Sequence, residues 1–263
     1  MDAALRVLMI AMGASLALNV GWHALRIFSQ QRRLSLSADT LSGFCREWAA
    51  AIWMIVGAPL ALLPHRPAAA LSELDGHPPV LLIPGYGLTR VMMWPLAAYL
   101  RRRGRWVWAI NNPIHEDDIP TFAAHAAACA DALRERTGAD QIDIVGHSMG
   151  GIVAAYYIAH LGGKDTVRRL VTLGTPWQGT RVAALGLGRQ SRALQPGSPV
   201  LASLEGFQHD TVALWSSDDC IVLPTPNAIP PHARAVELDR IGHLEMIHHS
   251  ATMRAVRDAL AAP

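Results

Sequence analysis

Short apolar runs and longer amphipathic stretches alternate along residues 72–263. Apolar runs bounded by Gly, Pro or Asn are typical of buried strands, and they occur at Val80–Ile83, Trp106–Ile110, Ile142–Val145, Leu170–Leu173, Val212–Trp215 and Ala235–Leu238. Helical patterns separate most of these runs, at Met92–Arg103, Ile119–Arg136, Gly150–His160 and from about Glu245 to Leu260. The alternation predicts an α/β domain in which a mostly parallel sheet carries helices on both faces.

Two charge-free apolar runs precede this domain. Val7–Leu25 is long enough to cross a bilayer core at about 1.5 Å per residue. Trp48–Leu63 is shorter and contains Gly57 and Pro59, so it fits a second span, a segment in the membrane interface, or packing on the domain. We therefore expect residues 1–71 to form a membrane anchor with one or two transmembrane helices, followed by the α/β domain at 72–263.

Two other readings of the apolar runs are open. The first run could be a cleaved signal peptide, or both runs could form a buried hairpin of a soluble protein. A signal peptide needs a basic start and a nearby small-residue cleavage site, whereas only Arg6 precedes the first run and Arg26 follows it directly. This arrangement favours a membrane anchor.

Basic residues predict the orientation of the anchor. The loop between the two apolar runs carries Arg26, Arg32, Arg33 and Arg46. Positively charged loops favour the cytoplasmic side. If both runs span, the domain lies on the periplasmic face of a bacterial inner membrane, which is the arrangement we expect. If the second run only lies in the interface, the domain stays in the cytoplasm.

Composition excludes several other kinds of protein. A net charge of +2 with 17% charged residues argues against a nucleic-acid-binding face. The three cysteines are odd in number and show no CxxC spacing, so neither a disulfide framework nor a zinc site is indicated. Glu245 and His248 have metal-ligand spacing but lack a second ligand pair, and His115–Asp118 fits a polar loop with a helix cap. We expect no metal and no cofactor.

The segment DIVGHSMGG at Asp143–Gly151 carries the strongest chemical signal. It places Gly146, Ser148 and Gly150 in a Gly-x-Ser-x-Gly pattern directly after a predicted strand and before a predicted helix. The glycines let strand and helix approach closely around a strained serine. The N–H groups of a helix that starts near Met149 would point toward a developing oxyanion. The pattern predicts Ser148 as a nucleophile.

GHSMGG resembles the nucleophile elbow of bacterial lipases and esterases of the α/β-hydrolase superfamily. The similarity extends from about Pro79 to His243, and LLIPGYG at Leu81–Gly87 resembles the oxyanion loop of these lipases, although many carry His at the position of Pro84. The resemblance implies that the backbone N–H groups of Tyr86 and Met149 form an oxyanion hole.

The same resemblance implies an acid and a histidine that follow the serine in chain order. ALWSSDDCIVLP at Ala213–Pro224 resembles the acid loop of these lipases and selects Asp219, with Asp218 as a solvated neighbour and Cys220 as a packing residue. His243 follows the last predicted strand, where its imidazole could reach Ser148 with Asp219 accepting the Nδ1 proton. We expect His248 and His249 on the surface of the last helix.

Further similarity concerns the substrate. GTPWQGT at Gly174–Thr180 resembles a segment of true lipases, with Trp177 in place of a frequent His. Val182–Leu204 resembles their lid, so we expect a lid-like segment at about 176–205; an ordinary connection with a short helix is the alternative. The resemblance implies a serine carboxylic-ester hydrolase that acts on lipid-like acyl esters through an acyl-enzyme. An acyltransferase on the same triad and a non-catalytic membrane scaffold are the alternatives.

Overall fold

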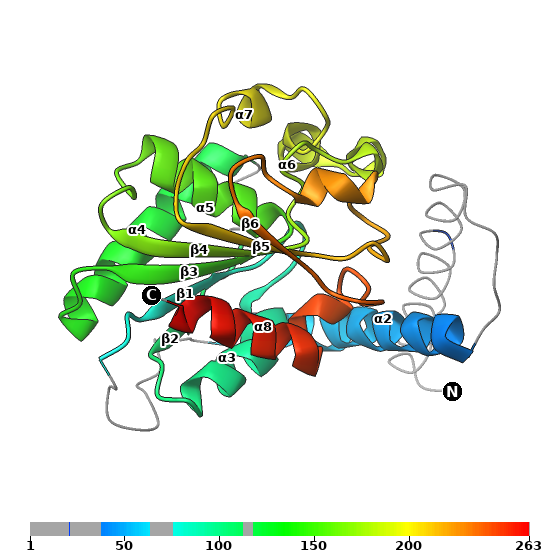
Figure 1. The fold of residues 1–263 in the computed structure, drawn as a ribbon, viewed down its shortest axis with the longest axis horizontal. Helices are drawn as coiled ribbons and strands as arrows, with labels where there is room; N and C mark the ends of the chain where they lie inside the picture. Colours follow the sequence, from blue (N-terminus) through cyan, green and yellow to red (C-terminus); the bar gives the residue numbers. More distant parts are fainter. Residues whose placement is uncertain (1–20, 22–37, 64–75, 113–117, 263) are drawn as a thin grey trace.

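The computed structural model describes Gly21 and residues 38–63, 76–112 and 118–262 (Figure 1). The first apolar run, Val7–Leu25, therefore lies outside the described residues apart from Gly21, and so do residues 115–117 of the polar loop. Asp118, the last residue of that loop, caps the following helix as expected, because its Oδ1 accepts the Thr121 N–H at 2.8 Å.

All six predicted strands are present, and they form one sheet in the order β2-β1-β3-β4-β5-β6. Every neighbouring pair is parallel, which confirms the predicted fold class. The chain runs from β1 outward to β2 and then returns to β3 on the other side of β1, so the order reverses there. In open parallel sheets such a reversal opens a crevice at the carboxyl ends of the strands. The strands are β1 Val80–Ile83, β2 Val107–Ala109, β3 Ile142–His147, β4 Val167–Leu173, β5 Thr211–Trp215 and β6 Arg234–Glu237.

Helices cover both faces of the sheet, because successive side chains of a strand point to opposite faces. Leu81 and Ile83 of β1 join the core under α4 (Ile119–Thr137) and α5 (Met149–His160). Val80 and Leu82 of the same strand join the core on the other face. That second core is covered by η2 (Arg90–Met93), α3 (Trp94–Arg101), η5 (Glu245–Ile247) and α8 (Ser250–Ala261).

The last predicted helix is divided into η5 and α8. His249 forms the N-cap of α8, and its Nδ1 accepts the Ala251 N–H at 3.2 Å, so α8 begins only at Ser250. His248 and His249 thus lie between the two helices, and both are half-buried. The expectation that they are helix-surface histidines is wrong, because a side-chain cap interrupts the helix.

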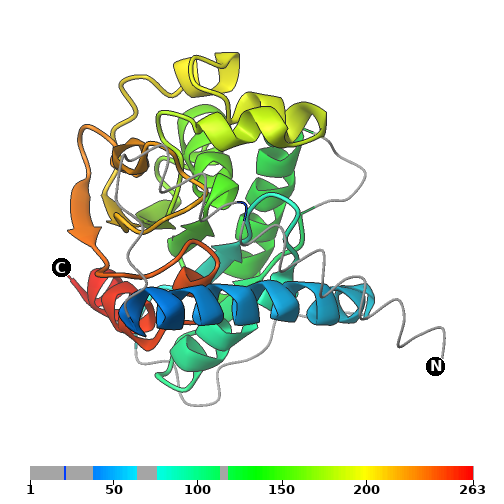
Figure 2. The same ribbon diagram turned by 90° about the vertical axis from the view of Figure 1, so that its right-hand side faces the viewer.

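The second apolar run forms the end of α2 (Ala38–Gly57) and η1 (Ala58–Leu62). By length and composition alone Leu41–Leu62 could cross a membrane, with a mean hydropathy of 1.2. However, both of its ends bind the α/β domain: Glu47 accepts N–H groups of the η5 turn, and the Arg90 guanidinium donates to the Ala61 carbonyl at 2.7 Å. In Figure 2 α2 lies lengthwise across the domain. The sequence allowed this run to span the membrane, to lie in the membrane interface or to pack on the domain. In the structure it packs on the domain.

Between β4 and β5 the chain forms three short helices instead of one. They are η3 (Arg181–Leu185), α6 (Gly188–Ala193) and α7 (Pro199–Ala202), and they lie in the segment for which we expected a lid. A further turn, η4 (Thr225–Ala228), follows β5. In Figure 1 α6 and α7 lie on the side of the sheet that α4 and α5 cover, and Leu194, Leu201 and Leu204 pack into that core.

Candidate active site

Ser148, Asp219 and His243 lie in loops that follow β3, β5 and β6. Because carboxyl ends of parallel strands meet at one edge of a sheet, these three loops come together. All three side chains are buried. His147, the residue before Ser148, brings the first and third loops into contact, since its Nε2 bonds to the His243 carbonyl at 3.0 Å.

Ser148 occupies a strained turn between β3 and α5. Its φ is 53° and its ψ is −125°, a backbone conformation that residues other than glycine rarely adopt. Its N–H donates to the Leu173 carbonyl at 2.8 Å, and the Thr175 hydroxyl donates to its carbonyl at 2.9 Å. These contacts hold the strained backbone. Gly150 is required two residues on, because a Cβ there would lie 2.7 Å from the Pro84 carbonyl oxygen.

Asp219 and His243 form a buried hydrogen-bonded pair. The Nδ1 of His243 lies 2.7 Å from Oδ2 of Asp219, and the other carboxylate oxygen accepts the N–H groups of Ile221 at 2.7 Å and Val222 at 2.9 Å. These donors fix the orientation of the carboxylate toward the imidazole. It is Asp219, rather than the half-buried Asp218, whose carboxylate meets the ring.

The negative charges of Asp219 and Glu47 raise the pKa of His243. Burial alone would lower the pKa of His243, but the charge of Asp219, the hydrogen bond to it and the charge of Glu47 outweigh burial and raise that pKa above its usual value. The neighbouring His147 shows the opposite behaviour. Burial, and then repulsion from His243, hold the pKa of His147 well below its usual value, so this ring is neutral.

The two candidate oxyanion donors come from the start of α5 and from the turn after β1. Met149 is the first residue of α5, so its N–H has no acceptor within the helix and points out of the positive helix end. Tyr86 lies in the turn after β1. A Cβ at the preceding Gly85 would stand 2.9 Å from the Cβ of Ser148, which shows how closely this turn approaches the serine.

The expected lid segment is attached to both sides of the site. On one side the Tyr86 hydroxyl donates to the Leu187 carbonyl at 2.7 Å. On the other side the Thr180 hydroxyl accepts the Leu223 N–H at 3.0 Å, in the loop that carries Asp219. Leu185 and Leu187 of this segment are 68% and 82% exposed, so it presents two apolar side chains beside the exposed Arg181 and Arg189.

Three residues of this site were not singled out from the sequence. Thr175 lies in the GTPWQGT segment, which resembles true lipases, but the resemblance gave it no role of its own, and His147 could have been flagged as a polar residue inside the serine motif. Glu47 carries no local signal, because it comes from α2 and meets the site only in three dimensions, at a separation of 197 positions from Leu244 along the chain.

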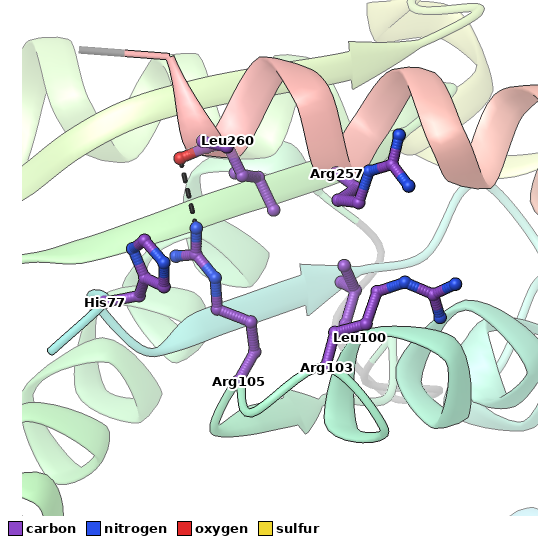
Figure 3. A pocket seen from close by; sticks show the side chains of 7 residues that line it. His77, Leu100, Arg103, Arg105, Arg257 and Leu260 are labelled. Atoms are coloured by element: carbon purple, nitrogen blue, oxygen red, sulfur yellow. Dashed lines mark hydrogen bonds between the residues drawn. The ribbon is translucent and has the colours of Figure 1, made fainter. Parts of the chain in front are cut away.

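A cavity of about 350 Å³ lies at the opposite edge of the sheet. Figure 3 shows Arg105 in this cavity, where its guanidinium donates to the Leu260 carbonyl at 3.1 Å. Arg105 also pairs with the buried Asp143, and Arg103 lies over the Tyr99 ring. These arginines serve the fold. The cavity lies by the amino ends of β1 and β2, away from Ser148, and we do not assign it to the active site.

Comparison with known proteins agrees with this geometry. Residues 78–225 match the sequence model of the alpha/beta hydrolase fold family, which covers more than half of the chain. The chain belongs to the α/β-hydrolase family. This α/β-hydrolase resembles a lipase of Bacillus licheniformis, BlEst2 in its mature form, at 16% identity and a TM-score of 0.64, over 74% of this chain and 97% of that one.

Two other solved structures show the same fold. Lipase B of Aspergillus fumigatus is 17% identical with a TM-score of 0.65, over 75% of this chain and 56% of that one. A 2-hydroxy-6-oxo-6-phenylhexa-2,4-dienoate hydrolase from a Rhodococcus species is 17% identical with a TM-score of 0.52, over 71% and 91%. At these identities the likeness concerns the fold.

Proposed function

We propose that this α/β-hydrolase is a serine carboxylic-ester hydrolase that acts on lipid-like acyl esters. The observation that carries the proposal is the 2.7 Å hydrogen bond between buried His243 and Asp219, together with the contact of His243 with His147, the neighbour of the strained Ser148. An imidazole held by a carboxylate on Nδ1 presents Nε2 as a base, which is what a serine hydroxyl needs to become a nucleophile.

The proposed reaction has two steps. The Ser148 oxygen attacks the acyl carbonyl while His243 takes its proton, and the oxyanion accepts hydrogen bonds from the N–H groups of Tyr86 and Met149. The intermediate then breaks its bond to the alcohol, which leaves with the proton from His243. Water attacks the acyl-enzyme while His243 takes its proton, and the bond to the Ser148 oxygen then breaks as His243 returns that proton to the oxygen and the carboxylic acid leaves. Asp219 keeps the Nδ1 proton in place throughout, and no cofactor takes part.

An apolar lid supports an acyl-chain substrate. Leu185 and Leu187 present apolar side chains on the segment that joins the Tyr86 turn to the Asp219 loop. An apolar flap next to a nucleophile suits a ligand whose chain must leave water or a membrane.

Membrane attachment is part of the same proposal. Val7–Leu25 is the proposed span in a bacterial inner membrane. The outer side of α2 and η1 would then rest on the bilayer surface, because it exposes apolar side chains in the manner of an interfacial helix. These are Leu41, Val56, Leu60, Leu62 and Leu63.

A fluorophosphonate probe tests the nucleophile. We expect it to label the full-length protein, to leave Ser148→Ala unlabelled, and to label Ser203→Ala normally, since Ser203 is an exposed serine of the lid region. Absence of labelling in the wild-type protein would favour the non-catalytic scaffold.

Product analysis separates the two catalytic alternatives. With a chromogenic ester and a series of competing alcohols, we expect free carboxylic acid as the main product. A new ester as the main product would favour the acyltransferase.

A further inference from the structure

The carboxylate of Glu47 is buried inside the loop that carries His243, although Glu47 belongs to α2. Its side chain is only 2% exposed. Oε1 accepts the Leu244 N–H and Oε2 accepts the Glu245 N–H, both at 2.8 Å. The Cys220 thiol, next to Asp219 in the chain, donates to Oε1 at 3.8 Å. One carboxylate from outside the sheet thus contacts the histidine loop and the acid loop together.

The two bonded N–H groups belong to the residues directly after His243. A carboxylate with one N–H on each oxygen fixes the direction of that backbone, as a bidentate contact does. Arg46, the neighbour of Glu47 on α2, pairs with Glu245, whose other oxygen accepts the Gly242 N–H at 3.2 Å. The turn on both sides of His243 is therefore held from α2.

Glu47 also brings a second negative charge close to the imidazole. Its charge acts with that of Asp219 to raise the pKa of His243. Burial raises the pKa of Glu47 itself to about 7, against the lowering effect of its two backbone bonds and of His243. The charged form of Glu47 therefore gains stability when His243 carries a proton.

We propose that Glu47 is a positioning residue, which orients the His243 loop and stabilises the imidazolium that forms during catalysis. The inference rests on the proposed role of His243 as the base that activates Ser148. It connects α2 to the chemistry of the site. A carboxylate that merely tied α2 to the domain would hold the fold without affecting the proton affinity of His243.

Other titratable groups of the described residues lie around this pair, among them Arg46, which pairs with Glu245. The sheet contributes His147 at the end of β3, and Asp219 and Cys220 after β5. The turn after β6 contributes Glu245 in η5 and His248 directly after it. Burial lowers the pKa of His248 to about 4, so it carries no charge near neutral pH. Asp219 raises the pKa of His243 more than Glu47 does, so the contribution of Glu47 is measured as the change in that pKa when Asp219 is left in place.

The test compares Glu47→Gln, Glu47→Asp and the matched control Arg46→Gln in the full-length protein. Gln removes the charge at the same size, Asp keeps the charge but is too short to hold both N–H groups, and Arg46→Gln breaks a contact between the same helix and the same turn. We expect kcat to fall on the order of tenfold to a hundredfold in both Glu47 variants, because a small misplacement of a catalytic group costs that much.

The proton affinity of His243, followed by NMR titration of its ring, distinguishes positioning from a simple structural tie. We expect Glu47→Gln to move the titration of His243 and the acid limb of kcat/KM to lower pH, while Glu47→Asp and Arg46→Gln leave both near the wild-type position. An unchanged titration in folded Glu47→Gln overturns the proposal. If Glu47→Gln does not fold, wild-type kcat in Glu47→Asp overturns it.

The two proposals fail separately. If the wild-type protein shows no esterase activity and no fluorophosphonate labelling, the proposed function fails. The NMR titration still reports whether Glu47 raises the proton affinity of His243.

Discussion

The Tyr86 hydroxyl bonds to both backbone groups of Leu187, donating to its carbonyl at 2.7 Å and accepting its N–H at 3.2 Å. The loop proposed to stabilise the oxyanion is thereby tied to the lid segment. The side-chain amides of Asn112 and Gln190 exchange hydrogen bonds of 3.1 and 3.0 Å beside this contact. Arg189 of the same segment pairs with Asp118 at the start of α4. These polar contacts join the lid segment to the turn after β1, to Asn112 after β2 and to the start of α4.

We predict that Tyr86→Phe loosens this lid without removing the oxyanion donor, because the backbone N–H remains. A hydrogen bond contributes about 0.5–1.5 kcal/mol, which corresponds to roughly a two- to tenfold rise in the open population. Activity on long-chain esters should then rise in the absence of detergent or an interface, with kcat little changed. Rates measured with and without micelles test this, with Tyr156→Phe on α5 as the control. The same dependence on micelles in Tyr86→Phe and wild type would show that the hydrogen bonds between Tyr86 and Leu187 do not hold the lid segment closed.

Removal of either member of the proposed nucleophile and base pair should abolish activity. Ser148→Ala and His243→Ala are each expected to lower kcat on p-nitrophenyl esters by on the order of 10⁴-fold or more, and the double variant by little more, because such groups act as a unit. Circular dichroism should show that both variants fold. A Ser148→Ala protein with near wild-type kcat would show that another residue is the nucleophile.

The two neighbouring carboxylates should differ sharply. Asp219→Asn leaves the imidazole of His243 in the wrong tautomer, a change that costs about 10⁴ in kcat in serine proteases. Asp218→Asn should have little effect, because it is Asp219 that bonds to the ring. Equal losses in the two variants would mean that the pair shares the role.

The pH dependence follows from the raised pKa of His243. A base must be neutral to accept a proton, so kcat/KM should fall as pH decreases through a pKa that lies above the usual 6.5 of histidine. Asp219→Asn removes the largest cause that raises this pKa, and the acid limb should move to lower pH. The residual activity of this variant, followed from pH 5 to 9, tests the direction. An acid limb that moves to higher pH would contradict the assignment.

The sheet and the serine motif could be predicted because their signals are local. The apolar runs at β1 and β3 are bounded by turn residues, and Gly146 and Gly150 mark the close approach of strand and helix. The chain order of the fold then directed attention to Asp219 and His243, and the structure brings them within 2.7 Å. Their catalytic role stays a prediction.

Other features depend on contacts that no short window contains. His249 caps α8 because its imidazole accepts the Ala251 N–H. The spacing of apolar residues along the sequence does not indicate such a contact. The polar end of α2 looks like the flank of a membrane segment until Glu47 meets the His243 loop from the far end of the chain. The domain boundary at residues 71 and 72 also stays a prediction, although α2 already packs against the α/β domain.

The last prediction is the orientation of the protein in the membrane. Because α2 and η1 bind the domain at both ends, through Glu47 and Arg90, we expect this segment to stay on the domain rather than cross a bilayer. A buried charge such as that of Glu47 would also be costly in hydrocarbon. We therefore predict that Val7–Leu25 is the single span, in contrast to the two spans expected from the sequence.

With one span, the arginines from Arg26 to Arg46 remain on the cytoplasmic side, and the catalytic domain stays there with them. Fusions of alkaline phosphatase and of a fluorescent protein that matures only in the cytoplasm, placed at Ala70 and at Pro263, distinguish the models. We expect fluorescence and no phosphatase activity at both sites. Phosphatase activity at both would instead favour a periplasmic domain, and it would require α2 to leave the domain that Glu47 and Arg90 attach it to.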